Sequence, residues 1–375
     1  MKFIIHTQEF NYLINKCLNI APAKPSIPIL SNILITAANG LITLTATDTN
    51  VSICCSSETQ VLEEGSTTVP AKKLSQLVNE LTSTTMEFST DTNDLSIIVA
   101  DSSRFRINGM NASAFPQLPE LHGAFHIKFK QSTLKTALYR TVFAVSKDMN
   151  RMTLTGVLMQ IAGSQATFIG ADGQRLSRMH IPLDIDPQYN KSLIIPLKAI
   201  EEFIKNLNGE EDVQLYLMDD KIAMQTDRVT IVTKLVPGEY PDVNRVIPGS
   251  VEHLVSIHRE ELVTLLRQVT LFTNVERHIV RFSFCNGELK LSANTSEIGE
   301  GRVSMPVNYH GNDLEIAFNP TYFLDVLRHV DEESVMMGLC DSFTPGVITD
   351  QKMTRYHPEE TSSLFMLMPM RLDED

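Results

Sequence analysis

Apolar residues recur along this chain with two periods, one typical of helices and one typical of strands. Six segments carry apolar side chains at positions i, i+3, i+4 and i+7, which is the pattern of a helix with one buried face. These segments are residues 10–17, 74–81, 134–141, 200–207, 262–269 and 323–330. We therefore expect six amphipathic helices, arranged along the chain as three pairs.

Alternating apolar and polar residues on both sides of a short turn predict three β-hairpins. Asn-Gly between alternating strands is the strongest short-range hairpin signal, and it occurs twice. The hairpins are residues 35–44, 159–168 and 282–291, with Asn39-Gly40, Gly163-Ser164 and Asn286-Gly287 at their turns. Because hairpins and helix pairs recur together at about 125 residues, the chain is interpreted as three copies of one module.

Prolines recur at the same spacing. Pro70, Pro196 and Pro320 stand at the start of the second helix of each pair. Proline suits the first helical turn because its missing N–H would have no partner there. Asn319, directly before Pro320, is a good N-cap residue.

Two proline-containing segments, residues 115–119 and 240–243, also lie one period apart and are interpreted as connectors between modules. The predicted modules are residues 1–124, 125–250 and 251–375. A helix with one apolar stripe must cover a sheet face, so we expect an α+β fold. Each module would pack two helices on antiparallel sheet.

Charge, cysteine count and hydropathy argue against several classes of protein. The formal net charge of −13 argues against a protein that coats nucleic acid by bulk positive charge. Five cysteines, an odd number without metal-ligand spacing, favour free thiols in a reducing cytoplasm. No apolar run reaches the roughly 20 residues of a membrane span. The first residues, 1–7, are interpreted as a strand and not as a signal peptide.

Catalytic and cofactor motifs are absent from the sequence. There is no phosphate-binding loop, no nucleophile elbow and no His-Glu-x-x-His zinc pair. Residues 299–304 lack the third glycine of a dinucleotide loop, and residues 91–94 and Asp172-Gly173 are interpreted as turns. We therefore expect a scaffold that is not an enzyme and needs no metal or cofactor. The alternatives are a repeat-built hydrolase with a site between modules, and a structural protein that never meets nucleic acid.

Four segments carry a family resemblance. They are residues 24–32, 171–176, 318–327 and 368–372, together with Met1-Lys2-Phe3 at the start. With three modules in one chain, the protein resembles the bacterial DNA sliding clamps, the beta subunits of DNA polymerase III. The resemblance implies a clamp fold that forms a ring, in which two chains join head to tail as a homodimer. Such a ring encircles double-stranded DNA without sequence preference and confers processivity on the replicative polymerase.

The resemblance and the charge pattern together suggest DNA contacts. The polar helix faces carry ten basic residues: Lys16, Lys72, Lys73, Lys135, Arg140, Lys198, Lys205, Arg259, Arg267 and Arg328. Seven acidic residues oppose them: Glu9, Glu80, Glu201, Glu202, Glu260, Glu261 and Asp325. Lys24 resembles the family's DNA-contacting basic residue, on a loop before a strand expected to start at Pro28. The candidate DNA-binding residues are Lys24, Lys72, Lys73, Lys147, Arg151 and Lys198. Met152 and Thr153 stand where the family pattern has aromatic residues.

The resemblance also implies two protein-binding surfaces. For the homodimer, an edge strand of module one with Arg104, Phe105 and Ile107 would meet Leu271, Phe272, Glu297 and Glu300 of module three. A cleft between modules two and three would bind short peptides from the polymerase, the clamp loader and repair polymerases. Its expected residues are Leu154, Gly173, Arg175, Leu176, Pro241, Arg245, Val246, Asn319, Tyr322, Phe343, Pro345, Met366, Leu367, Met368, Pro369, Met370, Arg371 and Leu372. Arg277 replaces an expected aromatic residue, and an acidic tail at 373–375 should favour basic-flanked peptides.

Overall fold

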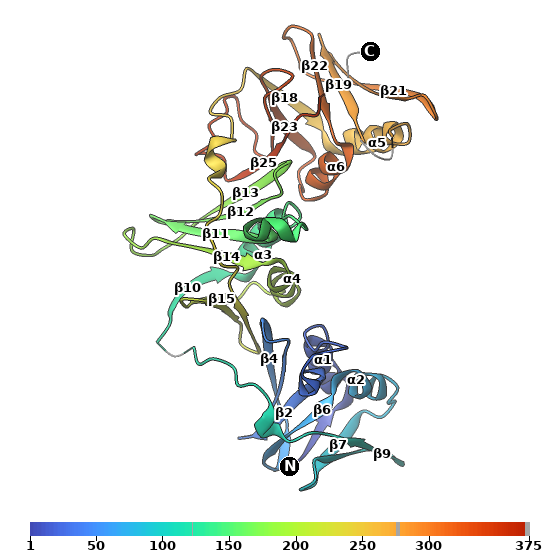
Figure 1. The fold of residues 1–375 in the computed structure, drawn as a ribbon, viewed down its shortest axis with the longest axis vertical. Helices are drawn as coiled ribbons and strands as arrows, with labels where there is room; N and C mark the ends of the chain where they lie inside the picture. Colours follow the sequence, from blue (N-terminus) through green and yellow to red (C-terminus); the bar gives the residue numbers. More distant parts are fainter. Residues whose placement is uncertain (122, 275–277, 372–375) are drawn as a thin grey trace. The chain divides into compact units, whose positions relative to one another are not determined.

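The computed structural model describes residues 1–121, 123–274 and 278–371, and the chain folds into two compact units (Figure 1). The first unit contains Met1–Ser132 and Glu201–Leu235, and the second contains Thr133–Ile200 and Val236–Asp375. Residues of the predicted middle module therefore contribute to both units.

All six predicted helices are present. They are α1 (Thr7–Leu18), α2 (Ala71–Asn79), α3 (Gln131–Val142), α4 (Leu197–Asn206), α5 (Arg259–Thr270) and α6 (Pro320–Arg328). Most residues of the predicted apolar stripes are buried, and Phe10, Leu13, Ile14 and Cys17 of α1 have no exposed surface. In the first unit α1 packs against α2 and the sheet strands β3 and β4, and in the second α5 packs against α6, β20 and β21. These two helix pairs thus cover antiparallel sheet, as predicted.

The prolines before the second helices occupy two different positions. Pro320 is the first residue of α6, and the side chain of Asn319 accepts a hydrogen bond from the N–H of Thr321, as predicted. Pro70 and Pro196 instead end the strands β6 and β14, one residue before α2 and α4. Pro70 has a ψ of 114° and is the N-cap residue of α2, so it directly precedes the first helical turn in which it was predicted to lie.

Two antiparallel sheets form the first unit. The five-stranded sheet has the order β5 (Gln60–Glu63), β1 (Lys2–His6), β7 (Thr85–Thr90), β8 (Leu95–Ala100) and β9 (Ser103–Asn108). The eight-stranded sheet has the order β10 (Phe125–Lys130), β15 (Asp212–Leu217), β16 (Lys221–Gln225), β17 (Val229–Lys234), β4 (Val51–Glu58), β3 (Leu41–Thr47), β2 (Asn32–Ala38) and β6 (Gly65–Pro70). Pairing of β17 with β4, with Ile231 opposite Ile53, joins strands that lie far apart in the sequence.

The second unit repeats this arrangement. Its eight-stranded sheet has the order β14 (Lys191–Pro196), β11 (Gly156–Ala162), β12 (Gln165–Ala171), β13 (Arg175–Pro182), β25 (Ser363–Leu367), β24 (Gly346–Thr349), β23 (Ser334–Leu339) and β18 (His253–His258). Its four-stranded sheet has the order β21 (Gly299–Pro306), β20 (Glu288–Thr295), β19 (Val280–Cys285) and β22 (Leu314–Phe318). Here the joint is between β13 and β25, with Leu176 opposite Met366.

Local sequence signals explain most turns. Asn39 and Gly40 have φ values of 50° and 74°, the positive pair that a type I′ hairpin requires. Residues before the second strand behave differently: Pro28–Ser31 forms a 3-10 helix, and β2 begins only at Asn32. The expectation of a strand starting at Pro28 is therefore wrong, because Pro28 has no N–H for strand pairing and the N–H of Leu30 bonds to the carbonyl of Ile27.

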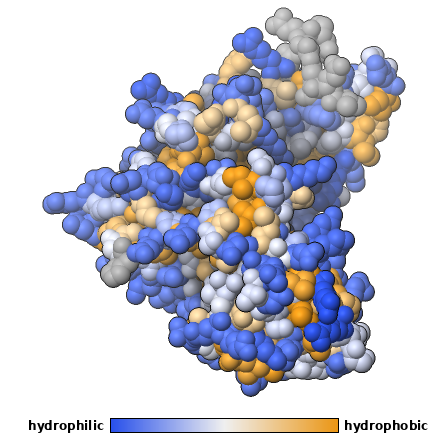
Figure 2. Space-filling model, turned by 60° about the horizontal axis from the view of Figure 1, so that its bottom comes forward, coloured by the Kyte–Doolittle hydropathy of each residue, from blue (hydrophilic) through white to orange (hydrophobic). Residues whose placement is uncertain are grey.

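Hydrophilic side chains dominate the face drawn in Figure 2, with small hydrophobic patches between them. Within each unit the core contains clustered aromatic rings. Phe3 stacks on Phe88 at 5.0 Å in the first unit, and Phe282 stacks on Phe323 at 5.0 Å in the second. None of the helices in the described ranges is long and apolar enough to cross a membrane.

Candidate functional site

Arg175, the first residue of β13, organises the expected peptide-binding residues. Its Nε donates to Oδ2 of Asp172 at 3.0 Å, and its Nη1 donates to Oδ2 of Asp325 at 2.7 Å. The guanidinium carbon lies 4.5 Å from the centre of the Tyr322 ring and 5.4 Å from that of Phe143. Two ion pairs and two ring contacts therefore hold this side chain in one orientation.

The turn before β13 is built by Asp172 and Gly173. Oδ1 of Asp172 accepts hydrogen bonds from the N–H groups of Gln174 and Arg175, which is the geometry of an Asx turn. Gly173 has a φ of +90°, and a Cβ there would lie 2.7 Å from Nη1 of Arg151. Asp172 therefore shapes a turn and orients Arg175, in agreement with the prediction of a turn.

The end of the chain contributes both core and surface. Met366 and Leu367 are buried in β25, which pairs with β13 on one side and β24 on the other. Beyond the strand, the N–H of Met368 bonds to the carbonyl of Gln174, and the N–H of Met370 bonds to the carbonyl of Ala317. The backbone is thereby fixed while the side chains of Met368, Pro369, Met370 and Arg371 are partly or fully exposed. The expected contributions of Leu372, the acidic tail 373–375 and Arg277 fall outside the described residues.

A small hydrophobic cluster packs beneath β13 and the end of the chain. Leu176 and Met366 belong to it together with Val243 and Ile247, and Leu154 packs against it. Leu176, Met366 and Leu367 are buried, so direct contact of these three side chains with a peptide would need rearrangement. These three side chains pack in the interior and stabilise the pairing of β13 with β25.

The other members of the expected set come from several segments of the chain and differ in their exposure. Gly173, Pro241, Arg245 and Val246 are exposed, while Asn319, Tyr322 and Pro345 are partly buried. Phe343 is 82% exposed, which is unusual for such an apolar side chain. Its loop is ordered by Asp341, whose Oδ1 accepts from the N–H groups of Phe343 and Thr344, and these bonds lower the pKa of the Asp341 carboxyl.

Electrostatics keep the aromatic side of this surface neutral. Burial, together with the nearby Asp172 carboxylate, raises the pKa of the Tyr322 hydroxyl. Burial also lowers the pKa of His329, which lies against the rings of Tyr139 and Phe143 at 4.4 and 4.2 Å. Arg175 and its two carboxylates therefore lie beside aromatic rings that carry no charge.

Sequence reasoning missed the partners that orient these residues. Asp325 was assigned to a polar helix face, yet it binds Arg175, and Phe143 was not considered. No sequence pattern links residues 143, 175 and 325, because tertiary folding alone brings them together.

The prediction that Arg140 lies on a solvated basic helix face is wrong. Arg140 binds Asp350 and, at 3.2 Å, Asp331, and its side chain is only 12% exposed. Other helix cations are also bound locally: Arg259 by Glu260 at 2.6 Å, and Lys205 by Glu202 at 2.7 Å. Fewer basic side chains on the helices are therefore available to contact DNA than the sequence suggests.

The six candidate DNA-binding residues are all exposed. Lys24 lies on the loop after α1, Lys72 and Lys73 lie in the first turn of α2, and Lys198 lies near the start of α4. Lys147 belongs to the loop that leads into the 3-10 segment Met149–Thr155, and Arg151 lies within that segment. Arg151 donates to the carbonyl of Asp172, which places it beside the turn at Gly173.

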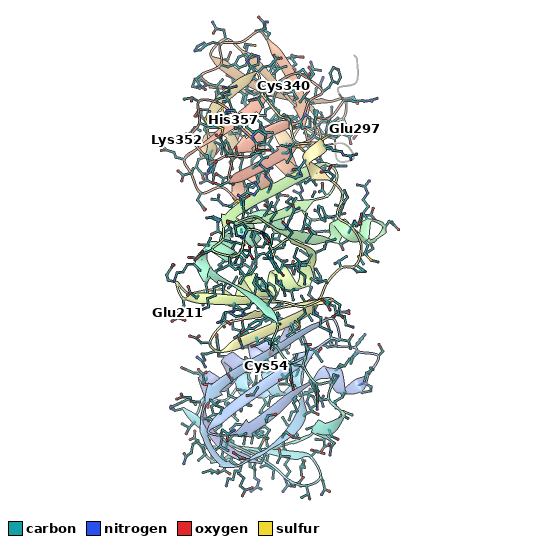
Figure 3. All side chains as sticks on the ribbon, turned by 90° about the vertical axis from the view of Figure 1, so that its left-hand side faces the viewer. Cys54, Glu211, Glu297, Cys340, Lys352 and His357 are labelled. Atoms are coloured by element: carbon teal, nitrogen blue, oxygen red, sulfur yellow. The ribbon has the colours of Figure 1, made fainter. Side chains whose placement is uncertain are left out.

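The candidate dimer residues lie on or near two edge strands, β9 and β21. Arg104, Phe105 and Ile107 belong to β9, the edge strand of the five-stranded sheet, and both apolar side chains are partly exposed. Leu271, just after α5, is 72% exposed, whereas Phe272 packs against Gly301 of the edge strand β21. Glu300 is on β21, and Glu297 is in the turn that precedes this strand (Figure 3). Leu271 is therefore not a core residue.

Within the described ranges, no three His, Cys, Asp or Glu residues are grouped so that they could hold a metal ion. All five cysteines are free thiols, and the sulfur atoms of Cys17 and Cys55 lie 3.7 Å apart in the core. Burial raises the pKa of the Cys17 thiol, which keeps it protonated.

Comparison with known proteins identifies the family. Three family models match in succession: the N-terminal, central and C-terminal domains of the DNA polymerase III beta subunit, at residues 1–119, 128–242 and 244–364. The chain is 43% identical to the beta sliding clamp of Chlamydia pneumoniae and 42% identical to that of Chlamydia muridarum, over 100% of each chain. It also superposes on the Pseudomonas aeruginosa sliding clamp, solved bound to griselimycin, with a TM-score of 0.94 at 28% identity, covering 99% of this chain and 100% of that one.

These matches confirm the α+β fold of three clamp modules and the predicted resemblance. The family also implies DNA and the replicative polymerase as partners. The chain belongs to the DNA polymerase III beta subunit family, the bacterial sliding clamps, and it acts as a non-catalytic processivity factor in DNA replication.

Proposed function

We propose that two copies of this chain close head to tail into a ring around duplex DNA. The observation that carries this proposal is the exposure of Leu271 beside β21, which, like β9, is an edge strand of its sheet. A head-to-tail contact joins two unlike surfaces, and it closes only when the rotation between copies completes a ring. An apolar centre of Phe105, Ile107 and Leu271 with a charged rim of Arg104 and Glu300 has ordinary interface anatomy.

The proposed DNA contacts are few and non-specific. Exposed lysines and arginines bind DNA phosphates through their charge. This binding weakens as the salt concentration rises, because cations from the salt compete for the phosphates. The candidates are Lys24, Lys72, Lys73, Lys147, Arg151 and Lys198. A closed ring stays on DNA by topology, so weak contacts leave it free to slide. This explains how a protein of charge −13 can function on DNA without a strongly basic surface.

The proposed peptide site is the surface around Arg175, which we name the Arg175 surface: Gly173, Arg175, Val246, Tyr322, Phe343 and residues 368–371. Exposed Phe343 and Met368 offer apolar contacts, and flexible thioethers suit several partners. Short extended peptides with a glutamine and two bulky apolar residues should bind here. They would come from the replicative polymerase, the clamp loader and repair polymerases. We place these interactions in the cytoplasm, where the cysteines stay reduced.

Retention on circular DNA tests the ring. The purified chain is loaded onto nicked circular DNA by an ATP-driven clamp loader, and the DNA is then linearised. A ring is retained on the circle and slides off the linear ends. Release at the same rate from both forms would contradict topological binding. Charge reversal at Lys24, Lys72 and Lys73 should reduce loading and its salt dependence without unfolding the chain.

Removal of residues 368–375 tests the peptide site. The truncated chain should still form a dimer in sedimentation, yet it should lose peptide binding and, because the clamp loader is proposed to use the same site, loading onto circular DNA. Removal of 373–375 alone is the matched control and should preserve peptide binding. Full peptide affinity in the longer deletion would show that the peptide binds elsewhere.

A further inference from the structure

The turn before β4 in the first unit has the same geometry as the turn before β13 in the second. Oδ1 of Asp48 accepts hydrogen bonds from the N–H groups two and three residues further along, at 2.9 and 2.8 Å. Oδ1 of Asp172 accepts the same two bonds in the second unit. The residue after each aspartate has a positive φ, +77° at Thr49 and +90° at Gly173. Both turns are therefore Asx turns with one left-handed residue.

A strand from a later part of the chain closes each turn in the same way. In the first unit β17 pairs with β4, and the N–H of Lys234, the last residue of β17, bonds to the carbonyl of Asn50 at 2.9 Å. In the second unit β25 pairs with β13, and the N–H of Met368, the residue after β25, bonds to the carbonyl of Gln174 at 2.9 Å. The first unit therefore contains a second copy of the backbone framework that carries the Arg175 surface, with Lys234 in the position of Met368.

A pocket of about 220 Å³ lies on this second framework, and we name it the Lys234 pocket. Its volume is below the roughly 300–1,000 Å³ of pockets that enclose a whole small molecule, so it has room for one or two side chains of a longer ligand. All but one of its main lining residues are exposed or partly exposed, so a ligand can reach them, and Val232 is the buried one. These residues are Thr49, Pro116, Pro119, Lys221, Val232 and Lys234.

Side-chain chemistry differs between the two copies of the framework. Val51, which is 2% exposed, stands at the position of Arg175. The exposed Lys234 replaces the thioether of Met368. The Lys234 pocket therefore lacks both the guanidinium and the flexible apolar side chain of the Arg175 surface, and it should recognise different peptides.

Two lysines give this pocket a positive charge. Lys234 makes no ion pair with any residue that the structure describes. Lys221 is paired with Asp220 at 3.2 Å, but the Asp220 side chain is 72% exposed. Such an exposed pair contributes little free energy and is readily exchanged for another carboxylate. The pocket therefore presents two ammonium groups beside an apolar wall made by Pro116 and Pro119.

We propose that the Lys234 pocket binds an extended segment of a partner protein through one acidic side chain and a neighbouring small apolar side chain. The carboxylate lies between the ammonium groups of Lys221 and Lys234, and the apolar side chain packs on Pro116 and Pro119. Every lining residue belongs to the first unit, so this site is separate from the Arg175 surface. It does not depend on whether glutamine-containing peptides bind at that surface.

Methyl NMR of the full chain tests the site, with the methyl groups of Thr49 and Val232 as reporters. The probe is acetyl-Val-Glu-Val-amide, and acetyl-Val-Gln-Val-amide removes only its charge. We expect saturable shifts with the probe and an affinity about three- to tenfold lower with the glutamine peptide, because two exposed ion pairs are lost. Equal affinities for the two peptides, or no shifts with the probe, would overturn the proposal.

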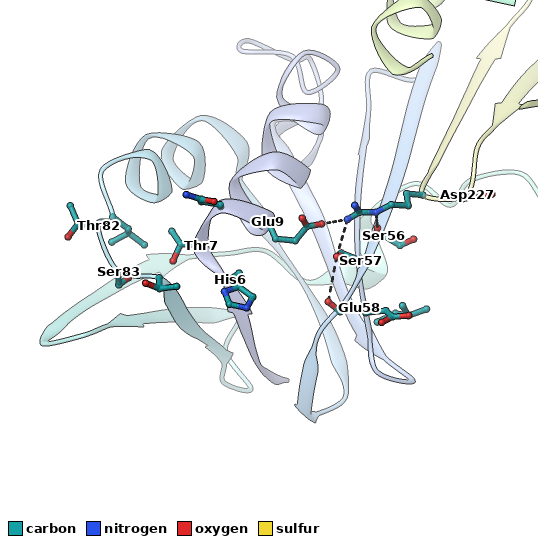
Figure 4. Close-up of a pocket in the computed structure, with 14 residues that line it drawn as sticks. His6, Thr7, Glu9, Ser56, Ser57, Glu58, Thr82, Ser83 and Asp227 are labelled. Atoms are coloured by element: carbon teal, nitrogen blue, oxygen red, sulfur yellow. Dashed lines mark hydrogen bonds and ion pairs between the residues drawn. The ribbon is translucent and has the colours of Figure 1, made fainter. Parts of the chain in front are cut away.

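A larger pocket of the first unit provides a control for location. It has a volume of about 910 Å³, lies where α1 begins, and shares no lining residue with the Lys234 pocket (Figure 4). Leu41 and Leu81 line it, so their methyl groups report binding there. These methyl groups should not shift with the probe. Shifts at Leu41 and Leu81 without shifts at Thr49 would overturn the proposal.

Matched variants separate this site from general charge and from the Arg175 surface. Lys234→Met introduces the side chain found at the same position of the second framework, and it should remove most of the preference for the glutamate probe. Lys128→Met removes one exposed charge from β10 in the same unit and should keep that preference. Removal of residues 368–375 should leave probe binding unchanged. An equal loss of preference in both lysine variants, or loss of probe binding in the deletion, would overturn the proposal.

Discussion

Arg175 stacks on the ring of Tyr322 at 4.5 Å and binds Asp325 three residues further along the same helix. One side chain from β13 therefore contacts two residues of α6 that lie about one helical turn apart. Because Tyr322 and Asp325 face the same way on the helix, the guanidinium plane meets a ring and a carboxylate together. This contact connects strand and helix segments that are about 150 residues apart in the chain.

Arg175→Lys should weaken the binding of partner peptides, although it keeps the positive charge. Lysine cannot bind Asp172 and Asp325 in a fork or stack as a plane on Tyr322. We expect a loss of roughly tenfold in affinity, measured by fluorescence polarisation with a labelled glutamine-containing peptide. Arg328→Lys is the control, because Arg328 also binds Asp325 but from the exposed side of α6. Equal losses in both variants would argue against a special role for Arg175.

Asp350→Asn should destabilise the second unit strongly. The side chains of Arg140 and Asp350 are 12% and 9% exposed, and removal of one member of such a pair leaves a buried charge. Breaking a buried pair costs about 3–5 kcal/mol. Arg140 keeps its ion pair with Asp331, whose side chain is 87% exposed, so the loss should lie at the lower end of this range. Urea unfolding followed by circular dichroism measures the change.

Two controls accompany the Asp350 variant. Asp212→Asn breaks the exposed pair with Lys130 and should leave unfolding unchanged. The double variant Arg140→Met with Asp350→Leu should recover stability, because no charge is left buried. A double variant as unstable as Asp350→Asn would show that the pair contributes through packing and not through charge.

Leu271→Asp should convert the proposed dimer into a folded monomer. The side chain is 72% exposed in the single chain, so the substitution has little folding cost, while a carboxylate at the interface centre is unfavourable. Sedimentation velocity at micromolar concentration gives the oligomeric state. Leu62→Asp on the exposed edge strand β5 is the matched control and should remain dimeric. A dimer of unchanged stability for Leu271→Asp would remove Leu271 from the interface.

The unfolding free energy should fall as the pH drops from about 6.5 toward 4. Burial, reinforced by the nearby Arg178 charge, lowers the pKa of His180 to about 4. In this range the unfolded chain binds a proton at this residue and the folded chain does not, so acid favours unfolding. Above pH 6.5 the contribution is constant. Urea titrations at several pH values should show this slope, and His180→Gln should reduce it.

Substitution of the exposed His310 is the matched control for the pH experiment. His310→Gln should leave the slope as in the unchanged protein. Part of the slope should persist in His180→Gln, because burial also lowers the pKa of His329. An unchanged slope in His180→Gln would show that another group controls the acid sensitivity.

The sequence by itself determined the helices, the hairpins and the threefold repeat. These depend on periodic apolar positions and on turn residues such as Asn39-Gly40, whose preferences act over a few residues. The exposed lysines of the helices and the N-cap at Asn319 could be read in the same local way. The family landmarks in the sequence pointed to Arg175, Tyr322 and Met368 as site residues.

Only the tertiary structure decided how these residues act. Strand pairing across long separations buried Met366 and Leu367, and it placed Arg140 against Asp350 instead of in solvent. The same pairing brought Asp325 and Phe143 to Arg175. Ion pairs and buried hydroxyls depend on which surfaces meet after folding, and a local sequence pattern does not identify those surfaces. For this reason the sequence predicted which elements form, while tertiary packing decided which charges remain available for binding.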